Sequence, residues 1–300
     1  MNILVERATN YKQLLSSLKD IVDDVPGRAD GRTKEMCEQW IFFRLFKTLT
    51  FANEIIFPVS AAKANPPDPD FIIFLGETRI GIEVTEATST DYSAYLTFIA
   101  KKEKNETEAP PIIIETASFR PNSWKRPRNR TDKIQAFEDE AKKCSLNSPG
   151  WSGNEPEQEW ANYIKDRIEK KLQKIDNYRQ TCSELWLAVY VNAPLPSIHY
   201  EEGLKLLIQK LESLSKLKTE DATLNKSNFG KKFDKIYILD GSMIICLDQD
   251  MRFKFYNYSI TEKNSLKRIQ SNTALENFID VHDLIDAEKI SDVSHEMDMS

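Results

Sequence analysis

Histidine, glycine and cysteine are all scarce in this chain of 300 residues. The three histidines are too few for a multi-histidine metal centre. The nine glycines never cluster, so the sequence contains neither a P-loop nor a dinucleotide-binding fingerprint. The four cysteines form no CxxC pair and have no regular spacing, which argues against a zinc knuckle and a disulfide framework. We interpret them as reduced thiols of a cytoplasmic protein.

Long apolar runs are also missing. No run approaches the ~18 residues that a membrane-spanning helix needs, and the N-terminus has no signal-peptide pattern. The sequence therefore predicts a soluble protein with no membrane contact. A hydrophobic content of 40% is sufficient for a sizeable core. The net charge of -6 argues against a protein that coats nucleic acid with its whole surface, but it allows a local basic face.

Hydrophobic periodicity predicts an α/β protein in which helices flank a small mixed sheet. The predicted helices cover 9–22, 32–50, 157–178 and 201–217, and the predicted strands cover 70–75, 79–86, 185–191, 235–239, 243–247 and 251–258. Residues 88–154 form a long insertion with a helix near 91–104, and residues 289–300 form a polar tail. We expect a single domain whose core comprises about 32–86 and 157–247.

Two acidic residues occupy neighbouring predicted strands. Asp70 begins the first strand and Glu83 lies midway along the second, so a hairpin between the strands would bring their carboxylates to one point. Buried carboxylates that meet repel each other unless a proton or a cation lies between them. This pair predicts a divalent-metal site of the kind that hydrolyses phosphodiesters. The alternatives are a solvated Glu83 on a half-exposed strand and, for the aspartate, Asp68 in a second Pro-Asp pair just upstream.

Two further charged residues fall within apolar helical stripes. Glu38 lies in the stripe of the helix 32–50, where an unpaired carboxylate would be costly to desolvate. Lys171 lies between Ile168 and Ile175 in the stripe of the helix 157–178, where its ammonium could face developing phosphoryl charge. Alternatively, Glu38 reaches solvent near the start of its helix, and Lys171 covers the core with its aliphatic stem.

The segment 119–133 carries six basic residues and one acidic residue. Guanidinium groups bind phosphates, and an aromatic ring can stack on an exposed base. The candidate nucleic-acid contacts are Arg120, Trp124, Lys125, Arg126, Arg128 and Arg130. A solvated basic loop without a partner is the alternative interpretation.

The chain resembles the PD-(D/E)xK nuclease superfamily, whose pattern is an aspartate, a spacer, then a carboxylate, any residue and a lysine. Here Pro69-Asp70 is followed after twelve residues by Glu83-Val84-Thr85. Glu38 matches the upstream helical glutamate of many members, including archaeal Holliday-junction resolvases. The resemblance covers roughly residues 32–86 and 157–192 and implies a restriction-endonuclease-like core.

The resemblance implies metal-dependent hydrolysis of nucleic acid, with DNA as the favoured substrate. Asp70, Glu83 and the carbonyl of Val84 would hold Mg²⁺ or Mn²⁺, with Glu38 acting through a water. Thr85 stands where the motif has its lysine, and in members with this change a lysine from the following helix can take its place. Lys171 is the candidate for that role.

Two other readings stay open at this stage. Thr85 favours a degenerate nuclease-fold module that binds nucleic acid or a protein partner without cutting. A plain scaffold, in which Glu83 and Lys171 form a buried ion pair, is the third. The sequence also leaves the oligomeric state open, and a homodimer is one option because nucleases that cut both strands often dimerise.

Overall fold

The computed structural model describes residues 2–18, 25–26, 30–105, 119, 139, 150–193, 195–220, 232–257 and 278–279. The predicted polar tail and most of the predicted insertion lie outside these residues. So do all of the basic segment's candidate contacts, namely Arg120, Trp124, Lys125, Arg126, Arg128 and Arg130.

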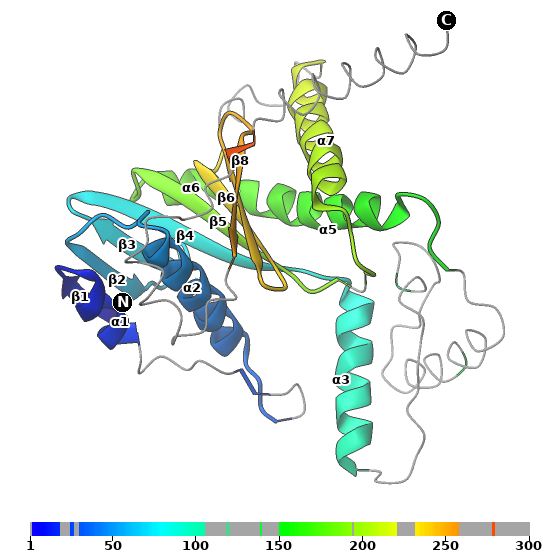
Figure 1. Cartoon of the computed structure of the whole chain (residues 1–300), viewed down its shortest axis with the longest axis horizontal. Helices are drawn as coiled ribbons and strands as arrows, with labels where there is room; N and C mark the ends of the chain where they lie inside the picture. Colours follow the sequence, from blue (N-terminus) through cyan, green and yellow to red (C-terminus); the bar gives the residue numbers. More distant parts are fainter. Residues whose placement is uncertain are drawn as a thin grey trace, which may run out of the picture.

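A mixed sheet of nine strands organises the described chain (Figure 1). The strands lie side by side in sequence order: β1 (Asn2–Ala8), β2 (Val59–Lys63), β3 (Phe71–Leu75), β4 (Thr78–Ala87), β5 (Glu184–Val191), β6 (Lys235–Asp240), β7 (Met243–Asp248), β8 (Phe253–Asn257) and β9 (Phe278–Ile279). The pairs β4–β5 and β5–β6 are parallel, and the other neighbouring pairs are antiparallel. The prediction of an α/β protein with a mixed sheet is confirmed, although the sheet is larger than expected.

Helices cover both faces of this sheet. They are α1 (Tyr11–Leu18), α2 (Lys34–Phe51), α3 (Thr90–Asn105), α5 (Glu155–Leu172), α6 (Ile175–Arg179) and α7 (Tyr200–Glu220). The apolar faces of α1 and α2 pack on one side of the sheet, and those of α5 and α7 pack on the other. The helix α3 follows β4 directly and extends away from the sheet (Figure 1). None of the described helices has both the length and the apolar character required to cross a membrane.

The helix predicted over roughly 157–178 is present, but it starts two residues earlier and is interrupted near its end. It begins earlier, at Glu155, because Pro156 falls in the first turn, where its missing N–H has no intrahelical partner to lose. It also breaks into two helices. The N–H of Lys174 donates to the carbonyl of Lys171 only three residues back, a tighter turn that separates α5 from α6.

Gly81 on β4 is packed closely by neighbouring side chains. A Cβ added there would lie 2.6 Å from Cγ of Pro69, 2.9 Å from Sγ of Cys182 and 3.0 Å from Cδ2 of Leu185. We therefore expect Gly81→Ala to destabilise the protein by about 1–3 kcal/mol, the usual consequence of overpacking. Equilibrium unfolding in urea measures this difference. An unfolding free energy equal to that of the wild type would show that the neighbouring side chains move aside freely.

Candidate functional site

The register of β3 and β4 sets Asp70 against Glu83. Phe71 pairs with Ile82, so one further step along the same antiparallel register places Asp70 opposite Glu83. The pairing with β3 reaches only to Ile82, whereas β4 continues to Ala87. The last residues of β4 therefore extend beyond their β3 neighbour, which leaves room for side chains from the helices on both faces of the sheet.

Asp70 is held by the backbone of the strand that it faces. Its Oδ2 accepts a hydrogen bond of 2.8 Å from the N–H of Val84. Burial and the nearby charge of Glu83 raise the pKa of Asp70, while this hydrogen bond and the charges of Lys171 and Lys34 oppose that shift. The two carboxylates thus repel each other at close quarters, as the sequence predicts for a pair that shares a site.

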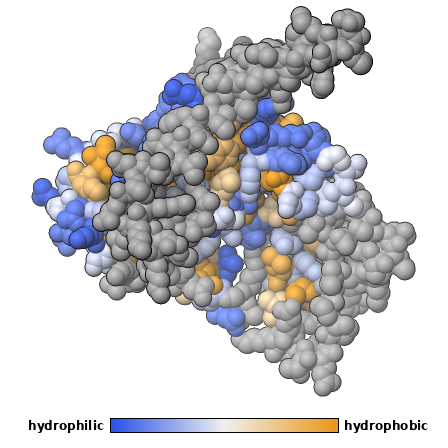
Figure 2. Space-filling view, in the orientation of Figure 1, coloured by the Kyte–Doolittle hydropathy of each residue, from blue (hydrophilic) through white to orange (hydrophobic). Residues whose placement is uncertain are grey.

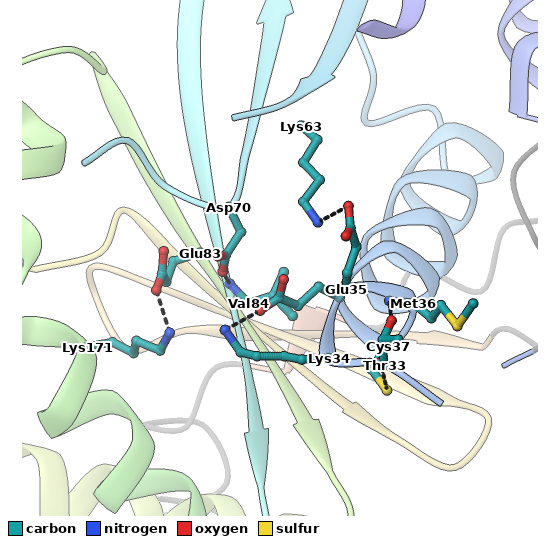
Figure 3. A network of polar contacts seen from close by, with 11 residues as sticks. Thr33, Lys34, Glu35, Met36, Cys37, Lys63, Asp70, Glu83, Val84 and Lys171 are labelled. Carbon is teal, nitrogen blue, oxygen red and sulfur yellow. Dashed lines mark hydrogen bonds and ion pairs between the residues drawn. The ribbon is translucent and has the colours of Figure 1, made fainter. Parts of the chain in front are cut away.

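Glu83 receives a cation from the opposite layer. Its side chain is only 4% exposed, and its Oε1 forms an ion pair with Nζ of Lys171 on α5. The side chain of Tyr178 on α6 lies near this carboxylate. Burial, followed by the charge of Glu83, raises the pKa of Tyr178, so the phenol stays protonated and remains a donor. Figure 3 shows Lys171 pointing from its helix to Glu83, with Asp70 alongside.

Glu38 approaches from the other face of the sheet, on α2. Its side chain is 11% exposed, and its Oε1 lies 2.7 Å from Nζ of Lys34, one turn earlier in the same helix. The Lys34 side chain is 84% exposed. Glu38 is therefore a buried carboxylate with an exposed cationic partner. It differs from both alternatives that the sequence allows, an unpaired charge in the core and a solvated residue at the start of the helix.

Side chains from α2, β4, α3 and α5 line one cleft of about 460 Å³. Its lining residues are Arg32, Thr33, Lys34, Cys37, Glu38, Ile41, Val84, Thr85, Glu86, Thr97 and Lys171. Figure 2, in the orientation of Figure 1, shows a hollow on this face of the molecule, with both hydrophilic and hydrophobic residues at its edge. Thr85 also lines this cleft, and the cations there come from α2, its preceding turn and α5.

Asp68, the alternative aspartate, is engaged elsewhere. Its Oδ2 lies 3.2 Å from Nη2 of Arg79, and its Oδ1 accepts a 2.8 Å hydrogen bond from the hydroxyl of Thr181. These contacts tie the turn before β3 to β4 and to the segment after α6. Asp68 has a structural role in the described chain, and Asp70 is the aspartate that faces Glu83.

The carboxylates of the site provide few ligands for a hard divalent cation. Within the described ranges, no group of three or more His, Cys, Asp or Glu side chains is arranged to hold a metal ion. Mg²⁺ is commonly bound through one or two protein carboxylates, with waters and substrate phosphates completing its octahedron. Asp70 and Glu83, a repelling pair beside the backbone of Val84, fit that smaller requirement. Glu38, engaged by Lys34, would contribute only through a water.

Several residues of the site were not among the predicted ones, and Arg32, Lys34 and Tyr178 are the ones that carry a charge or a hydroxyl close to the acidic residues. The spacing of Lys34 and Glu38, four residues apart on one helix, is a signal that could have indicated their ion pair. Tyr178 is the last residue of the predicted helix 157–178, and in the structure it lies on α6, close to Glu83.

Comparison of the chain with protein-family models, with curated proteins and with solved structures gave no match. The chemistry of the site therefore carries the functional assignment.

Proposed function

We propose that this chain is a metal-dependent nuclease of the PD-(D/E)xK type, with a restriction-endonuclease-like core and DNA as its substrate. The observation that carries the proposal is the ion pair of Lys171 with Glu83, directly beside Asp70. It supplies the acidic pair with a cation from α5, although Thr85 occupies the position of the motif lysine. Metal ligation, nuclease activity and DNA as the substrate all belong to this proposal.

Asp70, Glu83 and the carbonyl of Val84 would hold Mg²⁺ or Mn²⁺, and Glu38 would act through a water. The chemistry supplied by such a metal, when bound, is a lowered pKa for its water and polarisation of the scissile phosphate. In the hydrolysis, the oxygen of water bonds to phosphorus, one P–O bond to a sugar oxygen breaks, and that oxygen takes up a proton. The side chains around the acidic pair would orient the carboxylates and stabilise the developing negative charge.

Lys171 is the residue that would stabilise the negative charge that develops on the phosphoryl oxygens. Its ammonium is largely buried, with 17% of the side chain exposed, and a preorganised charge in such a site acts more strongly than in water. Tyr178 also lies near Glu83, and its protonated phenol could help to orient the carboxylate if the ammonium turned toward a phosphate. The N–H of Val84 holds Asp70 through its hydrogen bond.

A second candidate function is binding of nucleic acid or a protein partner without cleavage. The observation that favours it is the same ion pair, because an ammonium that stays bound to Glu83 offers less positive charge to a phosphate. The two functions differ in whether Lys171 serves the substrate or only the fold.

The test is incubation of the purified protein with plasmid DNA and with single-stranded DNA in Mg²⁺ or Mn²⁺, in parallel with EDTA. We expect cleavage that depends on the metal and that EDTA abolishes. Binding of Mn²⁺ without any cleavage would favour the non-cutting module. Absence of both cleavage and metal binding would contradict the assignment of Asp70 and Glu83 as a metal site.

A further inference from the structure

A second ammonium faces the acidic pair from the opposite layer of the fold. Lys34 is the first residue of α2, after Thr33, whose hydroxyl caps the helix by accepting a 3.2 Å hydrogen bond from the N–H of Met36. This cap fixes the first turn, so the backbone of Lys34 is anchored although its side chain is 84% exposed. In Figure 3, Lys34 and Lys171 extend from opposite sides, and their nitrogens point toward the same space beside Glu83.

Three carboxylates act on the Lys34 ammonium. Its hydrogen bond with Glu38 raises its pKa most, burial opposes this with the second-largest effect, and the charges of Glu38, Asp70 and Glu83 add smaller effects in the raising direction. Lys34 therefore stays charged at the mouth of the site. Of its partners, only Glu38 is in direct contact, at 2.7 Å.

The two partners of the Lys34–Glu38 ion pair differ in burial, and this difference favours exchange of the ammonium from Glu38 to a phosphate. An ion pair with one exposed partner is worth little, typically below about 1 kcal/mol, so a phosphate oxygen can compete for the ammonium. Glu38, in contrast, is buried at the cleft wall and would be left with an uncompensated charge if Lys34 departed. A cation that enters beside Asp70 and Glu83 would relieve that charge.

We propose that Lys34 is a phosphate-binding residue that exchanges partners. Its ammonium moves from Glu38 to a phosphate of the bound nucleic acid, and Glu38 then becomes free to contact the metal-bound water. With Lys171 on the other side, the cleft then holds the phosphate between cations from two helices on opposite faces of the sheet. This inference rests on the proposed function and deepens it: it names the residue that couples substrate binding to the availability of Glu38.

The exchange predicts effects of opposite sign on the two ligands in Lys34→Met. Affinity for a fluorescent duplex oligonucleotide, measured in EDTA, should fall about tenfold, and the slope of log K against log salt should shrink by about 1. Affinity for Mn²⁺, measured without DNA, should instead rise about fivefold, because a positive charge beside the carboxylates has been removed. Lys34→Arg should retain the DNA affinity, since guanidinium also binds phosphates.

The matched control is Lys170→Met, which removes the same charge from an exposed position on α5 outside the cleft lining. It should leave both affinities unchanged. A double-mutant cycle adds a sharper test: Glu38→Gln should strengthen metal-free DNA binding in the wild-type background more than in Lys34→Met, because only the former has an ammonium to release.

Two results would overturn the inference. If wild type cleaves DNA while Lys34→Met matches it in DNA affinity and salt slope, Lys34 does not bind phosphate and the proposed nuclease function still stands. If wild type binds neither DNA nor Mn²⁺, the proposed function fails and this inference fails with it.

Discussion

Replacing Lys171 with methionine is expected to reduce DNA cleavage by about 10²–10³-fold, the usual effect of removing one preorganised charge from an active site. Methionine retains the apolar stem, which packs along the α5 stripe, but it has no ammonium to face the phosphoryl group. Single-turnover cleavage of plasmid DNA in Mg²⁺ measures the loss. Mn²⁺ binding, measured alongside, should persist, because Asp70 and Glu83 remain in place.

The same substitution leaves Glu83 almost fully buried and without its cation. Breaking a buried ion pair by removing one partner commonly costs about 3–5 kcal/mol, so thermal unfolding must accompany the assay. The double variant Lys171→Met, Glu83→Gln separates the two roles, since it restores stability without restoring an ammonium. If a folded Lys171→Met protein cleaved DNA like the wild type, Lys171 would be a structural residue, as in the scaffold interpretation.

The acidic pair was predictable because its signal is local. Strand alternation puts Glu83 on the face opposite Ile82, and a short hairpin fixes which residue of the preceding strand lies across from it. Lys171 was predictable for a similar reason: the helical period shows a lysine inside an apolar stripe, and such a lysine needs a partner nearby. Both arguments use a period and a connection of a few residues.

The rest of the fold depends on contacts that no local pattern encodes. β1 and β2 were not predicted. β2 is five residues long with two alanines, and only its pairing with β1 and β3 makes it a strand. The break after Leu172 was not predicted either, and Tyr178, which lies near Glu83, is on the short helix that follows it. Lys34 appears on the sequence as an ordinary exposed helix residue, and its place at the site follows from how α2 crosses the sheet.

Asp70→Asn is expected to abolish metal binding and cleavage while leaving the metal-free protein as stable as the wild type or more so. The amide oxygen of asparagine can still accept the hydrogen bond from Val84, so the turn before β3 is preserved. Loss of one of two carboxylates should lower Mn²⁺ affinity by more than about 100-fold, beyond the 10–100-fold typical of losing an outer-shell partner. Titration calorimetry with Mn²⁺ and the plasmid assay measure the two losses.

The expected gain in stability follows from the sign of the pKa shift. The pKa of Asp70 is raised in the fold by burial and by the charge of Glu83, so the folded protein holds this proton more tightly than the unfolded chain does. Ionised Asp70 therefore lowers the free energy of unfolding above its folded pKa, and this penalty disappears as pH falls below the ordinary aspartate value. In EDTA, Asp70→Asn should exceed wild type in unfolding free energy at neutral pH and lose that advantage in acid.

Asp68→Asn is the matched control, two residues away and tied to Arg79 and Thr181 instead of the site. It should retain Mn²⁺ binding and cleavage and show no gain in stability at neutral pH. If Asp68→Asn lost the metal while Asp70→Asn kept it, the acidic pair would have been assigned to the wrong aspartate. A protein that gains stability when its own carboxylate is removed, and loses its ligand at the same time, is one whose acidic pair is maintained for binding a cation and not for the fold.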